Sequence, residues 1–209
     1  MQLIQFIASQ TQLPEPSIIN TVELLNSDCT IPFISRYRKE RTGNLDEVQI
    51  GEIVKLKELC DFEKGATGLA KAEPGEYPLV TTGAERKSCN TYQFDAKAVC
   101  IPLVSSTGHG HASLKNVHYQ EGKFALGSIL VALTSKDDRR LDIQFLHLYL
   151  SQLKDQVLVP LMSGAANVTL SVTKIQEIKI PLPPIEIQRE LVEKFKSIVV
   201  EGKRSINPT

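Results

Sequence analysis

Residues 181–195 have the sequence PLPPIEIQRELVEKF, in which paired prolines are followed by an amphipathic pattern. Proline is favoured at the start of a helix, because the first amides of a helix have no intrahelical partner. Apolar residues then recur every three or four positions and share one face; they are Ile187, Leu191, Phe195 and Ile198. We therefore predict an amphipathic helix over residues 184–203. Its apolar stripe predicts a docking surface for a partner or a second copy, with packing on its own domain as the alternative.

Short strand-like runs precede this helix along the chain. They are YPLVT, AVCIPLV, NVHYQ and GSILVALT, and turn residues separate them. The segment LDIQFLHLYLSQL has helical spacing, whereas residues 168–180, VTLSVTKIQEIKI, alternate as strands do. The pattern predicts an α+β fold, with a mixed-sheet domain over residues 55–183.

Residues 1–54 predict a small helical domain. Apolar residues recur there at helical spacing, and Ser17 is suited to cap the second helix. Residues 31–50, IPFISRYRKERTGNLDEVQI, predict a short basic helix and then another that runs from Asp46 toward Leu59. The basic helix carries Arg36, Arg38, Lys39 and Arg41. Internal pairing with nearby carboxylates and contact with phosphates are both open for these cations.

Overall charge excludes little. The chain has 24 basic and 24 acidic residues, which weakens the case for binding a polyanion through bulk charge but leaves a local basic face possible. The four cysteines form no CxxC pair, so we expect buried or half-buried free thiols. Neither a signal peptide nor a run of about 20 apolar residues is found. We therefore expect a cytoplasmic protein without a membrane partner.

Residues 54–203 resemble the target-recognition half of type I restriction–modification specificity subunits. The likeness lies in VKLKELCDFEKGATG, GEYPLVTTGAER, IPLVSSTGHGHAS, EGKFALGSILVAL and the PLPPIEIQREL ending, in the order that the family shows. It implies that residues 55–183 form a target-recognition domain for double-stranded DNA and that residues 184–203 form a spacer helix. The function it implies is sequence recognition, with no catalysis by this chain.

The same resemblance implies the partners. A DNA adenine methyltransferase subunit would bring S-adenosylmethionine, and a restriction (motor) subunit would use ATP and Mg²⁺, so this chain would need no cofactor or metal. Members of the usual kind have two recognition domains, whereas this chain has room for one. It would therefore form a homodimer or join another specificity chain, and a homodimer would read a palindromic target.

Three loops carry side chains suited to DNA contacts. Bases are distinguished by donors and acceptors that reach groove edges, and phosphates by cations and small donors. The first loop has the sequence TTGAERKSCN, the second SSTGHGHASLKN and the third LMSGAANVTLS. The predicted contacts are Thr81, Thr82, Arg86, Lys87, Asn90, Ser105, Ser106, Thr107, His109, His111, Lys115 and Asn167. For each loop, an ordinary solvated turn is the alternative.

The catalytic and metal alternatives have less support. The HxH pair of the second loop has no supporting carboxylate or cysteine within that loop, so we expect no metal site. The sequence contains neither a GxxxxGK[ST] phosphate loop nor a GxGxxG segment, and it lacks an NPPY-type methyltransferase motif. We therefore expect a chain that recognises DNA without modifying it.

The first 50 residues resemble another family. The segment TIPFISRYRKERTGNLDEVQI is similar to the N-terminal helical region of Tex transcription accessory proteins. The S1 RNA-binding domain of a Tex protein has no counterpart in this sequence. This likeness gives an alternative function, that of a nucleic-acid-binding transcription accessory factor.

Overall fold

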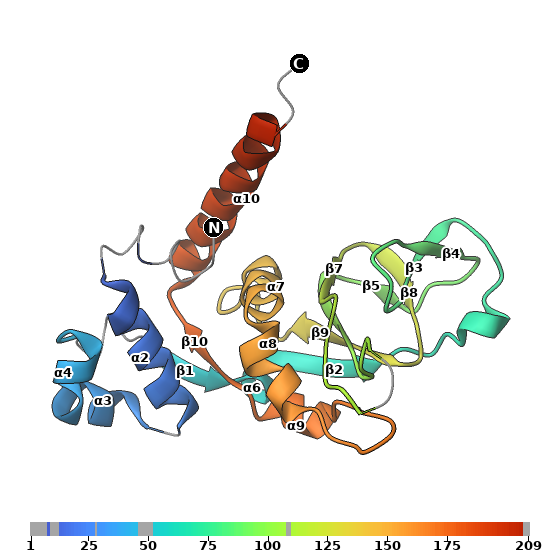
Figure 1. The fold of residues 1–209 in the computed structure, drawn as a ribbon. Coiled ribbons are helices and arrows are strands. Elements are labelled where there is room, and N and C mark those ends of the chain that lie inside the picture. Colours follow the sequence, from blue (N-terminus) through green and yellow to red (C-terminus); the bar gives the residue numbers. More distant parts are fainter. Residues whose placement is uncertain (1–7, 9–12, 28, 46–51, 108–109, 207–209) are drawn as a thin grey trace. The chain divides into compact units, whose positions relative to one another are not determined.

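Two compact units make up the chain in the computed structural model (Figure 1). The structure describes residue 8 and residues 13–27, 29–45, 52–107 and 110–206. Unit 1 comprises Met1–Leu56 with Glu177–Pro183, and unit 2 comprises Lys57–Gln176 with Pro184–Thr209. The segment 177–183, which the sequence assigned to the recognition domain, thus lies in unit 1.

Three short helices lie in the described part of unit 1. They are α2 (Glu15–Asn26), α3 (Ile31–Tyr37) and α4 (Lys39–Thr42). Their buried core consists of Leu24, Leu25, Ile34 and Leu45. The prediction that Ser17 caps the second helix is wrong, because α2 already begins at Glu15 and Ser17 lies buried inside its first turn. Pro16 is tolerated there, since a first-turn residue needs no amide donor.

A two-stranded antiparallel ribbon completes unit 1. Strand β1 (Glu52–Lys55) pairs with β10 (Lys179–Leu182), with Val54 opposite Ile180. The predicted helix from Asp46 toward Leu59 is therefore wrong at 52–55, and its first six residues lie outside the described part. The single turn α6 (Leu56–Leu59) follows the strand. Strand pairing with a distant segment, reinforced by a 2.6 Å ion pair between Lys55 and Glu177, overrides the local helical pattern.

Unit 2 contains two four-stranded sheets. The first has the order β2-β9-β6-β7 and is antiparallel throughout; the second has the order β4-β3-β8-β5 and includes the parallel pair β3–β8. Their bounds are β2 Cys60–Lys64, β3 Tyr77–Val80, β4 Lys87–Cys89, β5 Phe94–Asp95, β6 Ala98–Pro102, β7 His118–Gln120, β8 Lys123–Leu126 and β9 Leu130–Ser135. The predicted mixed-sheet α+β architecture is confirmed.

One apolar cluster connects the two sheets. It contains Ala98, Cys100, Leu130 and Ala132 from β6 and β9, together with Val80, Phe124 and Leu126 from β3 and β8. The Phe94 and Phe124 rings stack with centroids 4.9 Å apart. The sheets are therefore held together by burial of apolar surface.

Helices pack against the first sheet, and a long helix lies near the C-terminus (Figure 1). Helix α7 (Ile143–Gln152) is capped by the Asp142 carboxylate, which accepts from the amides of Gln144 and Phe145. The remaining elements are η1 Leu69–Lys71, α8 Lys154–Val157, η2 Val159–Leu161, α9 Val172–Gln176 and α10 Ile185–Ile206. The α10 prediction is confirmed. The strand-like interpretation of residues 168–180 is wrong at 172–176, where a one-turn helix directs Ile175 into the core.

The cysteines are free thiols, and most of them are buried. Cys60, Cys89 and Cys100 are buried free thiols and Cys29 is half-buried, as predicted. Burial raises the pKa of Cys60 and Cys100 to about 12, so both thiols are protonated at neutral pH. Within the described ranges, no helix combines the length and apolar character that crossing a bilayer requires.

Candidate DNA-recognition surface

The second and third predicted loops lie against each other in unit 2. Val104 and Thr169 form an isolated antiparallel bridge, and the Ser105 amide donates to the Val168 carbonyl at 2.9 Å. Gly110 also lies close to the third loop, since a Cβ built on it would be 3.6 Å from the Ala165 carbonyl oxygen. Two segments about 60 positions apart in sequence thus form one surface.

The first loop joins this surface through an amide side chain. Asn116, the last residue of the second loop, donates from Nδ2 to the Thr82 carbonyl at 3.1 Å. We call residues 81–87, 105–107, 110–116 and 163–169 the loop surface. The structure therefore brings together the three loops that the sequence singled out.

Hydroxyl groups of the second loop bind mainly to the loop itself. Ser105 Oγ donates to the His111 carbonyl at 2.5 Å, and Thr107 Oγ1 contacts Ser113 Oγ at 3.1 Å. Ser106 Oγ accepts from the Lys115 amide at 2.9 Å. These hydrogen bonds shape the loop, because each of the three predicted contact residues bonds to another part of the same loop. His109 lies outside the described residues.

The first loop also uses part of its predicted set internally. Thr81 is 5% exposed, and its hydroxyl accepts from the Gly83 amide at 3.3 Å. Arg86 extends its guanidinium to β7, donating from Nε to Gln120 Oε1 at 2.8 Å and from Nη2 to the Tyr119 carbonyl at 3.0 Å. Arg86 Nη1 lies 3.2 Å from His118 Nδ1. The guanidinium thus fastens the first loop to the edge of the first sheet.

Arg86→Ala is expected to lower the free energy of unfolding of unit 2 by about 1–2 kcal/mol, because it leaves half-buried acceptors on β7 without their donor. Urea denaturation measures the change. Lys87→Ala is the matched control: the adjacent cation is exposed, so its loss should change stability by less than about 0.5 kcal/mol. Equal effects of the two variants would show that the guanidinium does not hold the loop.

The buried histidine His118 lies next to the Arg86 guanidinium. Burial and the neighbouring Arg86 guanidinium lower the pKa of His118 to about 4. Burial also lowers the pKa of His147, whose Nε2 lies 3.0 Å from the Val117 carbonyl oxygen. Both rings are therefore neutral at pH 7. A proton on His118 would place two cations beside each other.

Acid is therefore expected to weaken unit 2. The pKa of His118 is about 4 in the folded chain and about 6.5 when unfolded, so the unfolded state binds more protons between those values. Stability is fully present above about pH 6.5 and falls, by at most about 3 kcal/mol, as the pH approaches 4. Denaturation of wild type and His118→Gln across this range measures the effect, which appears as a shallower pH dependence of the variant. Parallel curves would contradict the assignment.

Other predicted side chains remain available on the loop surface. Lys87, His111, Lys115 and Asn167 are exposed, and Thr82 is half-buried. They supply cations, a carboxamide and a hydroxyl, which are the groups that contact phosphates and base edges.

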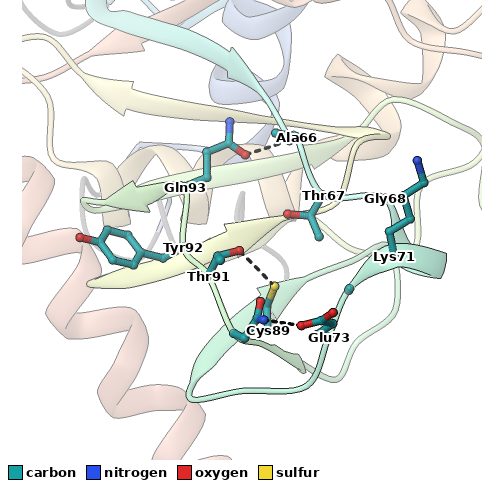
Figure 2. Close-up of a pocket in the computed structure, with 11 residues that line it drawn as sticks. Ala66, Thr67, Gly68, Lys71, Glu73, Cys89, Thr91, Tyr92 and Gln93 are labelled. Carbon is teal, nitrogen blue, oxygen red and sulfur yellow. Dashed lines mark hydrogen bonds between the residues drawn. The ribbon is translucent and has the colours of Figure 1, made fainter.

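Asn90 lies apart from these residues. It is the last residue of the first loop, follows β4 at the end opposite residues 81–86, and lines a pocket of about 430 Å³ (Figure 2). Its Nδ2 donates to Glu73 Oε2 at 2.7 Å, and its amide donates to the Glu73 carbonyl at 2.9 Å. Lys71 and Tyr92 also line the pocket. No sequence pattern marked these two residues, because residues 66–73 and 89–93 meet only through the fold.

The apolar stripe predicted for α10 does not coincide with the most buried side of that helix. Gln188 and Val192 are 0% and 7% exposed, and Gln188 bridges the Asp142 amide (2.9 Å) and the Arg140 carbonyl (2.8 Å). Ile187 is 44% exposed, whereas Leu191 and Phe195 are half-buried. Nothing is described for the Ile198 side chain. The apolar stripe of α10 thus extends beyond the side of the helix that packs on the rest of unit 2.

Comparison with known protein families shows which family has this sequence pattern. Residues 51–204 match the type I restriction modification DNA specificity domain. The chain belongs to this family. Residues 1–67 also match the Tex-like protein N-terminal domain, so the two matches overlap at the ribbon strand β1 and at β2.

Individual relatives agree with both matches. A putative type I specificity subunit of Mycoplasma pneumoniae is 28% identical over 151 residues, which is 68% of this chain and 38% of that protein. The transcriptional accessory protein Tex of Neisseria gonorrhoeae is 34% identical over 65 residues, 31% of this chain and 9% of that protein. This specificity-domain chain therefore spans less than half of the length of either relative.

Solved structures support the fold. The type I restriction–modification S subunit of M. genitalium superposes with a TM-score of 0.56 at 16% identity, over 70% of this chain and 38% of that one. The predicted family and α+β fold are confirmed by these comparisons.

Proposed function

We propose that this chain is the sequence-reading component of a type I restriction–modification system, acting in the cytoplasm, where the DNA is. The observation that carries the proposal is the convergence of three loops on one surface of a specificity-domain family member. Thr82, Lys87, His111, Lys115 and Asn167 would contact DNA there, with Asn90 at the separate pocket. Thr81, Arg86, Ser105, Ser106 and Thr107 would hold the loops in shape.

Catalysis would belong to partner subunits. A DNA adenine methyltransferase subunit would bind S-adenosylmethionine and flip the adenine out of the duplex, and a motor subunit would use ATP and Mg²⁺ to restrict unmodified DNA. This chain would recognise the DNA sequence and perform no chemical step. Its own residues would bind and orient the duplex.

Reconstitution with the methyltransferase subunit tests the function. The full chain, that subunit and S-adenosylmethionine are incubated with genomic DNA, and methylated positions are mapped by sequencing. We expect adenine methylation at a single sequence. Lys87→Ala combined with Lys115→Ala should reduce the yield at least tenfold, whereas replacing Lys97, an exposed cation that is not part of the loop surface, with alanine should not. Failure to methylate any sequence would contradict the proposal.

The exposed edge of α10 would join this chain to a second copy or to another specificity chain. Ile187 lies on that edge, so Ile187→Asp is expected to shift the chain toward the monomer without changing its stability by more than about 0.5 kcal/mol. Sedimentation velocity measures the change. Glu186→Gln, also exposed and adjacent on the helix, serves as the control. An unchanged oligomeric state in Ile187→Asp would remove α10 from the interface.

A second function is favoured by the match of residues 1–67 to the Tex-like N-terminal domain. On this alternative, the chain is a nucleic-acid-binding accessory factor in transcription. Tighter binding of RNA than of target duplex, together with co-purification of RNA polymerase, would favour it over sequence-directed methylation.

A further inference from the structure

One segment of unit 1 concentrates positive charge, although unit 1 as a whole carries six Lys and Arg against eight Asp and Glu. Residues 31–41 contain four cations, Arg36, Arg38, Lys39 and Arg41, against the single anion Glu40, whereas the whole chain balances 24 against 24. Three of the four, Arg36, Lys39 and Arg41, are exposed. Arg41 lies 3.5 Å from Glu23 with both side chains about half exposed, a pairing too solvated to neutralise Arg41 itself.

Two aromatic rings share this region with the cations. Tyr37 is 64% exposed and Phe33 is 37% exposed, and their ring centroids lie 5.5 Å apart. They occupy positions i and i+4 of α3, so they stand side by side on one face of the helix (α3 is labelled in Figure 1). The core of unit 1 is contacted from the other side of α3, where Ile34 is fully buried. Packing therefore does not explain the exposed rings.

An arginine links the rings to the charge. The Arg38 guanidinium carbon lies 5.2 Å from the Phe33 ring centroid, and Arg38 Nη1 donates to the Tyr37 carbonyl at 3.1 Å. The guanidinium is held by the ring and the backbone, while no carboxylate contact with it is found among the described residues. We call Phe33, Arg36, Tyr37, Arg38 and Lys39 the aromatic–basic surface.

We propose that the aromatic–basic surface binds single-stranded nucleic acid, with one unpaired base stacked on Tyr37 and the cations contacting adjacent phosphates. Cations alone would fit any polyanion, and exposed rings alone would fit an apolar partner. Alternation of rings and cations fits a strand whose bases are accessible, because every base offers a face for stacking and every linkage carries a negative charge. The duplex-reading loops lie in unit 2, so this site is independent of the proposed function.

Binding of short oligonucleotides to the full chain tests the proposal. Fluorescence anisotropy is measured with labelled 12-nucleotide oligo-dT, 12-nucleotide oligo-rU and a 12-base-pair duplex. We expect both single strands to bind more tightly than the duplex, and Tyr37→Ala to raise the Kd for single strands at least fivefold, the lower end of what base stacking contributes. Tyr37→Trp retains a stacking face and should restore binding. The tighter of the two single strands identifies the natural ligand type.

Charge variants test the phosphate contacts. Arg36→Ala combined with Lys39→Ala should reduce the dependence of log Kd on log salt, by about 0.7 for each phosphate of a single strand that the variant no longer neutralises. Lys64→Ala, an exposed cation of unit 2, is the matched control and should leave the slope unchanged. Circular dichroism verifies that each variant keeps its helices.

Three results would overturn the proposal: no binding of either single strand by wild type, an unchanged Kd in Tyr37→Ala, or equal weakening of single-strand and duplex binding. The last would reduce the site to a general phosphate contact. None of these results affects adenine methylation by the reconstituted complex, so this inference and the proposed function fail separately.

Discussion

Replacing Gly65 by alanine is expected to lower the free energy of unfolding of unit 2 by about 3 kcal/mol or more, because overpacking against rigid backbone cannot relax. A Cβ on Gly65 would lie 2.1 Å from the Gly127 carbonyl oxygen and 2.5 Å from the Leu126 carbonyl oxygen. Both oxygens belong to main chain at the end of β8. Urea denaturation would show the loss as a lower midpoint.

The position of Gly65 explains the size of the effect. Strand β2 ends one residue earlier in the first sheet, and the Gly65 amide still donates to the Leu130 carbonyl at 3.0 Å. Two residues later, the Thr67 amide donates to the Leu126 carbonyl of the second sheet, also at 3.0 Å. The chain thus crosses between sheets at Gly65, and any displacement there strains both.

Gly68→Ala provides a control from the same crossing. No atom lies within 4 Å of a Cβ built on Gly68, and its φ of −75° and ψ of 125° suit alanine. The replacement should be neutral or stabilise by about 0.5 kcal/mol, because alanine reduces the entropy of the unfolded chain. Similar destabilisation by both substitutions would show that close approach is not the cause.

Replacing Gln188 by leucine is expected to cost about 2–4 kcal/mol, because each buried polar group left without a partner costs about 1–3 kcal/mol. The Gln188 side chain is 0% exposed and satisfies the Asp142 amide and the Arg140 carbonyl. Leucine has a similar volume but neither donor nor acceptor. Denaturation measures the cost, and amide hydrogen exchange at the start of α7 should rise in the variant.

Glu190→Gln on the same helix is the control. Glu190 is exposed and paired with Lys194, so its replacement should change stability by less than about 1 kcal/mol. If Gln188→Leu proved as mild, the two hydrogen bonds would not be what holds α10 against unit 2. If it proved costly, self-association through the proposed α10 interface should weaken with it, since the helix would lose its support.

Elements with strong local patterns could be predicted from the sequence. Helix α7 has a regular apolar period and an Asp142 cap, and α10 follows two prolines, so both were found. Residues 52–55 and 172–176 could not be assigned correctly, since the first pairs with a strand more than 120 positions away and the second is a single turn. Tertiary pairing is not visible in a local period.

The candidate DNA-recognition surface could also be predicted only in part from the sequence. Residue types suited to DNA marked the three loops, and the structure brings those loops together. The use of each side chain could not be predicted, because Arg86 bonds to residues 33 and 34 positions away and Asn90 to one 17 positions away. Sequence alone indicates that a guanidinium is present, whereas its partners depend on which strand edge lies beneath it.

The ribbon of β1 and β10 has a consequence for how this chain could diversify. Val54 and Ile180 face each other across the ribbon, so residues 57–176 leave and rejoin the chain at neighbouring points. A segment anchored in this way behaves as a cassette, because a replacement of different length or specificity needs only the same two junctions. Recombination at the ribbon could then replace residues 57–176, and with them the proposed DNA specificity, while helices α2–α4 and α10 stay unaltered.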